Sequence, residues 1–507
     1  MVRNFICTSD NPVVKTKEGK LRGYIYDETY TFHGIKYAEA DRYMPPRRIS
    51  PWEGVKDAVN YGEVAPGSNP AIGHDIICPH MFWPESEDCL FLNIWTRSVD
   101  PSAKKPVMFW IHGGGFSAGS SIEQVAYDGA NLCKYGDVVV VSINHRLNFL
   151  GYLDLSPFGE KYRNSGNCGQ ADIVTALEWV RDNIANFGGD PGNVTIFGQS
   201  GGGAKCTALL QTPSADGLFH KSIMMSGTGG RRPKRERKDR EIVEKAIEKL
   251  GFGLGEIEKI ETVELDALTR AIKAALTETG VMRGNMMPFG PTPNDWYVGD
   301  PYEVGFTPHA RTIPIMVGSV FAEFSRAAPI PKKDDLTSEE RRKFIVDTLG
   351  DEYTDKLIEL FRQAYPGKNE IYLRDMSNRL GTLEYCTEKA SQSSAPTYNY
   401  VFSLIFPIYD GIASWHCADI PFVFHNTDKV LYCNVPGISE RLEDQVCSSF
   451  VSFARSGNPN NKHIPEWREF KPGMEATMIF DAETRAGIDF DKALMDVHKN
   501  VMPSFPF

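Results

Sequence analysis

The chain has 507 residues, of which 41% are apolar when Tyr and Cys are counted and 24% are charged. This composition is ordinary for a globular protein, and a mean hydropathy of −0.32 excludes an integral membrane protein. The 55 Lys and Arg against 66 Asp and Glu leave a net charge of −11, which disfavours non-specific binding to nucleic acid or anionic lipid.

Short apolar runs alternate with helical patterns along most of the chain and predict an α/β fold. The predicted strands lie at 90–95, 106–111, 138–143, 194–197, 222–226, 313–318, 398–405 and 476–480. Several of them have little polar alternation, which is typical of strands covered by helices on both faces of a sheet. We therefore expect a single domain over 1–507 with a large, mostly parallel central sheet. Helical insertions at about 227–312 and 325–396 are expected to form the lid and the substrate pocket.

Three helices are predicted from their residue patterns. The segment 171–186 repeats apolar residues along one helical face. A T-x-x-E capping box opens a helix over 338–349. The segment 438–455 carries an apolar stripe, and Gly457 is expected to end that helix.

The first residues, MVRNFICTSDNPVVK, contain no uninterrupted apolar segment, so no secretory signal is predicted. No run approaches the roughly 18 apolar residues that a membrane span needs, and we expect a cytoplasmic protein. The ten cysteines include no CxxC pair and are expected to be free thiols in or near the core. Cys78 and Cys89 are the only pair that we would test for a disulfide. The basic run at 231–240 is interpreted as a solvated approach to the following helix.

The pattern G-x-S-x-G, which can surround a nucleophilic serine, occurs twice, at 198–202 and at 115–119. The first copy follows the apolar run VTIF and leads into a predicted helix, which is the context that a nucleophile turn requires. The second copy leads into GSSIEQVAYDG, where no helix is predicted. We therefore interpret Ser200 as the nucleophile and Ser117 as a loop serine.

The loop that contains Ser117 is better interpreted as a partner of Ser200. HGGGF at 112–116 follows a predicted strand, and consecutive glycines let backbone N–H groups converge on an anionic oxygen. Acyl transfer needs such donors where charge develops on the substrate carbonyl oxygen. A dinucleotide-binding loop is the alternative, but it requires a helix directly after the glycines and an acidic residue at the end of the next strand. That strand ends instead in Asn-His-Arg at 144–146.

A serine nucleophile needs a base, and the base needs an orienting carboxylate, in the chain order Ser, acid, His. Glu323 lies just past the predicted strand at 313–318, where such an acid is expected; a solvated loop glutamate is the alternative. Six histidines follow Ser200, and of these only His416 lies on a loop that follows a long strand and also follows Glu323. A structural histidine is the alternative there. Asp419 is interpreted as a local capping or salt-bridge residue.

In five blocks the sequence resembles the type-B carboxylesterase (cholinesterase-like) family of α/β-hydrolases. The blocks are FHGIKYAEA (32–40), SEDCLFLNIW (86–95), HGGGF (112–116), GNCGQADIVTALEWVRDNIANFGGDPGNVTIFGQSGGG (166–203) and FARSGNPN (453–460). The resemblance implies an α/β-hydrolase fold, hydrolysis of carboxylic esters and no cofactor. It also implies the site residues: Ser200 as nucleophile, His416 in HCADIPFVF as base, Glu323 in IMVGSVFAEF as acid, and an oxyanion hole from the amides of Gly114, Gly115 and Gly201.

Two residues depart from the pattern of that family. Gln199 stands where the family usually has Glu, and Phe324 stands where it usually has Gly after the catalytic glutamate. A charge about 5–6 Å from the imidazole is worth about 3 kcal/mol at an effective dielectric of 20. We therefore hypothesise that neutral Gln199 makes the base harder to protonate and the pocket less attractive to cationic substrates.

The sequence thus predicts a serine esterase that acts on a small-molecule ester, as a monomer or homodimer, without a metal, a nucleic-acid partner or a membrane span. Phe116, Gln199 and Trp415 are candidates for contact with the substrate. Tyr297 belongs to a wider group of aromatic residues that could line an apolar pocket. Two alternatives stay open: the same machinery could hydrolyse an amide, a carbamate or a lactone, or the fold could serve a catalytically silent binding or adhesion protein.

Overall fold

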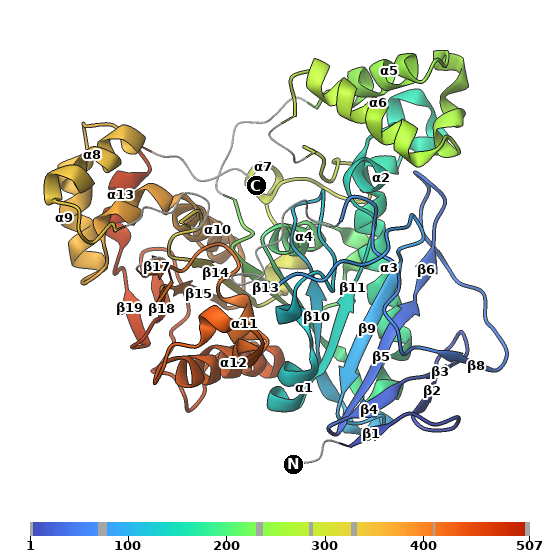
Figure 1. The fold of residues 1–507 in the computed structure, drawn as a ribbon, viewed down its shortest axis with the longest axis horizontal. Helices are drawn as coiled ribbons and strands as arrows, with labels where there is room; N and C mark the ends of the chain where they lie inside the picture. The colour runs from blue at the N-terminus through green and yellow to red at the C-terminus, as the bar shows by residue number, and fades with distance from the viewer. Residues whose placement is uncertain are drawn as a thin grey trace.

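A sheet of twelve strands forms the centre of the molecule (Figure 1). The computed structural model describes residues 4–68, 79–229, 237–282, 287–325, 332–408 and 411–501. From β11 (Val139–Ile143) through β18 (Ala476–Phe480) all neighbouring strands are parallel, and the pairs towards both edges are antiparallel. In order across the sheet, the strands are β1 (Phe5–Ile6), β4 (Tyr24–Tyr26), β5 (Thr29–Lys36), β9 (Phe91–Thr96), β11 (Val139–Ile143), β10 (Lys105–Ile111), β12 (Gly189–Gln199), β13 (Lys221–Met225), β14 (Ile315–Val320), β15 (Thr397–Phe402), β18 (Ala476–Phe480) and β19 (Arg485–Ile488).

Each predicted strand coincides with a strand of this sheet, but the prediction at 398–405 joined two elements. β15 ends at Phe402, and the short β16 (Ile405–Phe406) pairs with β17 (Ile412–Ala413) outside the sheet. The strands before residue 60 were not predicted, because none of them carries an apolar run and all except the eight-residue β5 have only two or three residues. They include two small sheets: β2 (Val13–Lys15), β3 (Lys20–Arg22) and β8 (Val55–Asp57), and β6 (Ala38–Glu39) with β7 (Arg47–Arg48).

The helices predicted at 171–186, 338–349 and 438–455 are present, and so is the helix predicted after the motif at 198–202. α3 covers most of 171–186, α8 begins with the predicted capping box, and α12 ends at Gly457, which has φ 78°. The α-helices are α1 (Ala130–Gly136), α2 (Asn148–Tyr152), α3 (Cys168–Asn183), α4 (Gly201–Leu210), α5 (Asp239–Lys249), α6 (Leu265–Glu278), α7 (Pro301–Val304), α8 (Ser338–Leu349), α9 (Thr354–Ala364), α10 (Ser377–Gln392), α11 (Ile420–Val423), α12 (Ser439–Ser456) and α13 (Lys492–His498).

β10 shows how one strand supplies two cores on opposite faces of the sheet. Val107, Phe109 and Ile111 belong to the same buried cluster as the apolar face of α3. Met108 and Trp110 belong to the cluster that contains the apolar stripe of α12. Successive side chains of a strand point to opposite faces, so the absence of polar alternation in this run reflects cover on both sides.

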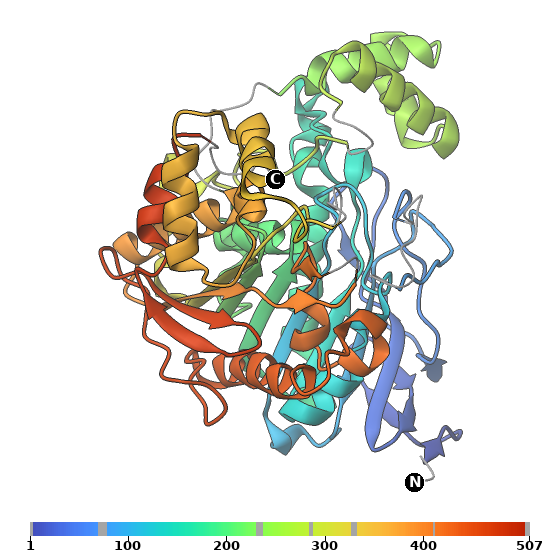
Figure 2. The same ribbon diagram turned by 60° about the vertical axis from the view of Figure 1, so that its left-hand side comes forward.

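The two predicted insertions contain helices that lie towards the carboxyl ends of the parallel strands. The first, at 227–312, includes α5 and α6, which pack on each other and stand apart at the upper right of Figures 1 and 2. The second, at 325–396, includes α8, α9 and α10, and α10 packs on β14 and β15. α5 begins at Asp239, directly after the basic run, of which residues 231–236 lie outside the described residues.

Cys89 is a free, buried thiol, and its suggested partner Cys78 lies outside the described residues. Among the helices that the structure describes, none combines the length and the apolar character needed to cross a membrane. Within the same described ranges, no group of three or more His, Cys, Asp or Glu side chains is placed to hold a metal ion.

Candidate active site

Ser200 lies in the turn between β12 and α4, at the carboxyl edge of the sheet. Its backbone has φ 57° and ψ −125°, which non-glycine residues rarely adopt, and its N–H donates to Met225 O at 2.8 Å. The flanking glycines make the turn tight: a Cβ on Gly202 would lie 2.0 Å from Ile111 O, and one on Gly198 would lie 2.5 Å from the Gly202 carbonyl carbon. The strand, sharp turn and helix expected around a nucleophilic serine are therefore present.

The HGGGF loop lies directly beside this turn. Gly114 has φ 82° and Gly115 has φ 65°, both in the left-handed region that glycine tolerates. A Cβ on Gly201 would lie 2.3 Å from the Gly115 nitrogen, and a Cβ on Gly113 would lie 3.5 Å from Cβ of Ser200. The structure thus brings the three predicted oxyanion-hole residues together with the predicted nucleophile.

Glu323 lies just after β14, is 2% exposed and contacts the predicted base. Its Oε2 accepts a hydrogen bond from His416 Nδ1 at 2.5 Å, and the His416 backbone N–H donates to Glu323 O at 2.9 Å. The other carboxylate oxygen accepts from Ser226 Oγ and from Asn378 Nδ2, each at 2.7 Å. These contacts hold the carboxylate in place, and the carboxylate holds the His416 ring with its proton on Nδ1.

Gln199 links this pair to the nucleophile turn, because it directly precedes Ser200. Its side-chain nitrogen lies 3.4 Å from Nδ1 and 3.3 Å from Nε2 of His416. Its side-chain oxygen accepts a hydrogen bond from Cys417 Sγ at 3.2 Å. The ring of Phe324 stacks on the same imidazole, with 6.5 Å between the ring centroids. Both departures from the family pattern therefore lie against the predicted base.

Two further buried acids lie near this pair. Burial raises the pKa of Asp419 to about 7, and its Oδ2 accepts a hydrogen bond from Tyr400 Oη at 2.9 Å. Asp419 stands at the N-cap position of α11, but its side chain makes no capping hydrogen bond there, so the side-chain capping role that the sequence suggested is wrong. Burial also raises the pKa of Asp375 to about 6, and the charge of Glu323 acts in the same direction. Of these three acids, Glu323 is the one hydrogen-bonded to the His416 ring.

A cavity of about 200 Å³ lies along α4, next to the nucleophile turn. The glycine loop, α4 and both insertions contribute to its wall. Phe116, a candidate for contact with the substrate, and Tyr297, one of the aromatic residues that could line a pocket, both line this cavity. Tyr302 and Tyr385 line it too and were missed, because isolated aromatic residues give no signal that separates a pocket from the core.

Trp415 does not have the place expected of it. The side chain is 1% exposed and packs on Phe406 and Tyr432, with ring centroids 5.0 and 4.5 Å away. Although Trp415 directly precedes His416, its indole lies in the apolar core. The structure gives it a packing role rather than the predicted contact with substrate.

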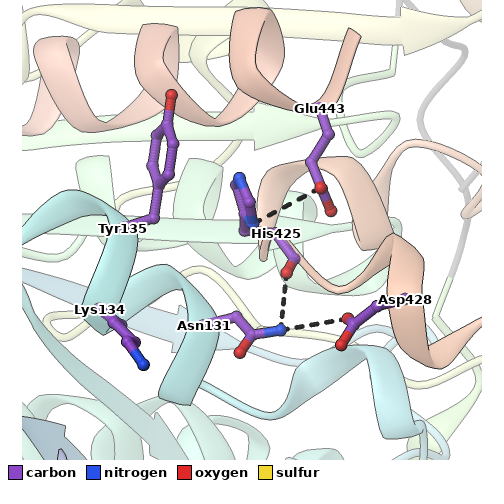
Figure 3. Close-up of a pocket in the computed structure, with 6 residues that line it drawn as sticks. All are labelled: Asn131, Lys134, Tyr135, His425, Asp428 and Glu443. Atoms are coloured by element: carbon purple, nitrogen blue, oxygen red, sulfur yellow. Dashed lines mark hydrogen bonds and ion pairs between the residues drawn. The ribbon is translucent and has the colours of Figure 1, made fainter. Parts of the chain in front are cut away.

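A larger cavity, of about 410 Å³, lies between α1 and α12 (Figure 3). Its polar groups bond one another: Asn131 Nδ2 donates to His425 O at 2.9 Å and to Asp428 Oδ1 at 3.2 Å, and His425 Nδ1 lies 3.5 Å from Glu443 Oε2. Within the part of the chain that the structure describes, none of the site residues predicted from sequence lines this cavity. Size alone therefore does not mark the site.

Comparison with known proteins decides the family. A family model described as the carboxylesterase family matches residues 10–494. The chain belongs to the carboxylesterase family. Among curated relatives of this carboxylesterase, the para-nitrobenzyl esterase of Bacillus subtilis (strain 168) is 32% identical over 485 residues, which cover 93% of this chain and 95% of that protein. Phenmedipham hydrolase of Pseudarthrobacter oxydans is 29% identical over 490 residues, with the same two coverages of 93% and 95%.

Solved structures agree with this assignment. An esterase from the anaerobe Clostridium hathewayi, described as able to hydrolyze aliphatic aromatic polyesters, is 46% identical with a TM-score of 0.92, over 99% of this chain and 100% of that chain. Carboxylesterase EST55 of Geobacillus stearothermophilus is 33% identical with a TM-score of 0.72, over 95% and 99% of the two chains. This carboxylesterase therefore has the α/β-hydrolase fold and is a carboxylic ester hydrolase, which confirms the predicted fold and enzyme class.

Proposed function

We propose that this carboxylesterase cleaves its ester through an acyl-enzyme on Ser200, with His416 as base, Glu323 as the residue that orients the base, and an oxyanion hole from the glycine amides. One observation carries the proposal. At one edge of the sheet, Ser200 lies in a strained turn beside the glycine loop. Gln199, the residue before it, contacts the ring of His416, and Nδ1 of that ring is 2.5 Å from the buried carboxylate of Glu323.

The chemistry follows from the proton positions. Because Glu323 accepts the Nδ1 proton, the lone pair of the His416 ring that can take a further proton is on Nε2. His416 takes the Ser200 proton as the hydroxyl oxygen attacks the ester carbonyl, and the N–H groups of Gly114, Gly115 and Gly201 stabilise the oxyanion. The imidazolium then gives its proton to the leaving alkoxide, which departs as the alcohol.

Water completes the cycle by the same route. His416 takes a proton from water, the resulting hydroxide attacks the acyl-serine carbonyl, and the oxyanion forms again in the same hole. When the tetrahedral intermediate collapses, the bond to Ser200 breaks and His416 returns the proton to the serine oxygen. The products are one carboxylic acid and one alcohol, and no cofactor enters the balance.

The cavity along α4 supports an ester with an aromatic group on one side of the scissile bond. Phe116, Tyr297, Tyr302 and Tyr385 present rings to a space of about 200 Å³, and aromatic rings pair favourably with one another in such a space. The esterase from Clostridium hathewayi, described by its action on aliphatic aromatic polyesters, is 46% identical to this chain.

Fluorophosphonate labelling followed by peptide mapping tests the nucleophile. We expect one modified residue, Ser200, and loss of p-nitrophenyl ester hydrolysis in step with labelling. A panel of ethyl acetate, phenyl acetate and ethyl benzoate then tests the substrate class, and we expect the two aromatic esters to have the higher kcat/KM. Labelling at another residue would overturn the proposed nucleophile, and a preference for ethyl acetate would overturn the aromatic pocket.

A further inference from the structure

Lys205 is a buried cation that the reaction scheme does not use. It lies on α4, five positions after Ser200, and is 0% exposed. Its Nζ donates hydrogen bonds to His112 O at 3.0 Å and to Gly113 O at 3.4 Å, the two carbonyls that open the glycine loop. Lysine is almost never fully buried unless its ammonium has partners, so these two carbonyls account for its position.

The contact with Gly113 O has a consequence for the next amide. In a trans peptide unit the C=O of one residue and the N–H of the following residue point in opposite directions. Lys205 and the neutral His112 ring, whose Nδ1 lies 3.0 Å from the same oxygen, hold the Gly113 carbonyl from one side. The N–H of Gly114 must therefore point to the other side of the loop.

The Gly115 N–H, the neighbouring amide of the proposed oxyanion hole, is oriented by backbone contacts alone. Gly114 O accepts hydrogen bonds from the backbone N–H groups of Ser117 and Ala118, at 3.2 and 3.0 Å. By the same peptide geometry, this contact sets the direction of the Gly115 N–H. The loop thus has one amide oriented by backbone alone and one whose direction depends on two side chains, the ammonium of Lys205 and the ring of His112.

The charge on Lys205 has a buried counterpart. Burial lowers the pKa of Lys205 to about 7, and the charge of Glu123 opposes that shift. Burial raises the pKa of Glu123 to about 7, and Lys205 opposes that shift in turn. Glu123 lies under the same loop, because a Cβ on Gly119 would lie 3.3 Å from its Oε1.

We propose that Lys205 is a positioning residue for the oxyanion hole, whose ammonium fixes the Gly113 carbonyl and thereby aims the Gly114 N–H at the substrate oxygen. The inference rests on the proposed acyl-enzyme mechanism. It predicts that Lys205 contributes to stabilisation of the transition state and little to binding of the ground state.

Lys389 provides a matched control. It is also 0% exposed, burial lowers its pKa to about 7, and its Nζ donates to Ile313 O at 3.0 Å and to Ser393 Oγ at 2.6 Å. Ile313 precedes β14, so this lysine lies at the amino ends of the parallel strands, whereas Ser200 lies at their carboxyl ends. The substitutions Lys205→Met and Lys389→Met remove the same donors from equally buried positions.

The experiment compares the two variants with wild type in kcat, KM, melting temperature and inhibition by an aryl trifluoromethyl ketone, which forms a tetrahedral oxyanion on the serine. We expect K205M to lower kcat by about 10–100-fold, less than the 10²–10³-fold cost of deleting a donor outright, with KM changed less than about threefold. The inhibition constant should weaken by the same factor as kcat/KM. K389M should lower the melting temperature but leave kcat within about twofold.

Equal kcat values in K205M and K389M, or an inhibition constant unchanged in K205M, would overturn the role of Lys205. If K205M does not fold, K205Q takes its place and keeps one amide donor; we expect a smaller loss of kcat in the same direction, and no loss would overturn the inference. Failure of the proposed mechanism gives a different result, because wild type itself would then show neither labelling of Ser200 nor inhibition by the ketone.

Discussion

The two G-x-S-x-G segments, 198–202 and 115–119, lie against each other at one edge of the sheet, yet they are built differently. Ser200 has φ 57° in a turn between a strand and a helix, whereas Ser117 lies in a loop and donates its hydroxyl proton to Met287 O. Burial does not separate them, because both serines are 9% exposed. The same five-residue pattern therefore places one hydroxyl at the carboxyl edge of the sheet and ties the other to the backbone.

The glycines of the two segments have different physical causes. Gly202 is needed because a Cβ there would meet Ile111 O at 2.0 Å. Gly119 is needed because its φ is 92° and because a Cβ would meet the His112 ring at 2.8 Å. The second segment still serves the site, through the backbone N–H groups of Ser117 and Ala118 that hold the glycine loop. A motif thus indicates chemistry only together with the elements that flank it.

Substitution of the two serines should produce the largest difference between the segments. We expect Ser200→Ala to lower kcat by about 10⁶-fold, as expected when a triad nucleophile is removed. Ser117→Ala removes one buried hydrogen bond, worth about 1 kcal/mol of unfolding free energy, and should leave kcat within about threefold. Steady-state hydrolysis of p-nitrophenyl esters, with thermal unfolding of both variants, measures the two effects. Comparable losses of kcat in both variants would contradict the assignment of Ser200.

The parts of the site that could be predicted from sequence follow the central strands directly. β10, β12 and β14 are buried on both faces, so they stand out as apolar runs, and the residues just after them lie at the carboxyl edge where catalytic groups gather. Ser200 could be placed for this reason, and Glu323 could be singled out, although a solvated loop glutamate stayed open until the family resemblance was added. His416 needed the family resemblance as well, because its loop follows β15 only after further short elements.

The contacts that hold the site together could not be predicted, because they depend on how helices pack on the sheet. Asn378 belongs to no recognisable motif, yet it lies in the first turn of α10, which brings its amide to within 2.7 Å of Glu323. Lys205 was part of a predicted helix, but its burial depends on which face of α4 meets the glycine loop. Trp415 was misplaced for the opposite reason, since adjacency in sequence to His416 says nothing about where its indole points.

Glu323→Gln should cause the second largest loss, by acting on Ser200 through the base. The carboxamide has only one acceptor oxygen for the donors that now surround the carboxylate, and its nitrogen would favour the wrong tautomer of His416. We expect kcat to fall by about 10⁴-fold, as for the corresponding change in a serine protease triad. Asp419→Asn is the control: this acid bonds to Tyr400 rather than to the ring, so kcat should change far less. A similar loss in both variants would contradict the role of Glu323.

The smallest effect is expected at Gln199, the residue before the nucleophile. Its contact with the ring of His416 has no equivalent in the second G-x-S-x-G segment. Its side-chain nitrogen lies 3.3 Å from Nε2 of His416, so a carboxylate in its place would face the ring directly. A negative charge there favours the protonated imidazole, and protonation then occurs at higher pH. We expect Gln199→Glu to move the acid limb of the kcat/KM profile upward by about two pH units, since an interaction of about 3 kcal/mol at an effective dielectric of 20 corresponds to about two units at about 1.4 kcal/mol each.

Gln199→Met separates charge from shape, because it keeps the length of the side chain and adds no charge. The acid limb of the kcat/KM profile of Gln199→Met should lie at the same pH as in wild type. The Gln199→Glu variant should also gain on a cationic choline ester relative to the neutral 3,3-dimethylbutyl ester of the same acid, because the added carboxylate attracts the ammonium and the isosteric neutral ester lacks it. If the preference for the choline ester changes but the acid limb does not move, the added carboxylate interacts with the substrate and not with His416. The contact between Gln199 and His416 then has no part in setting the pH range in which the base is active.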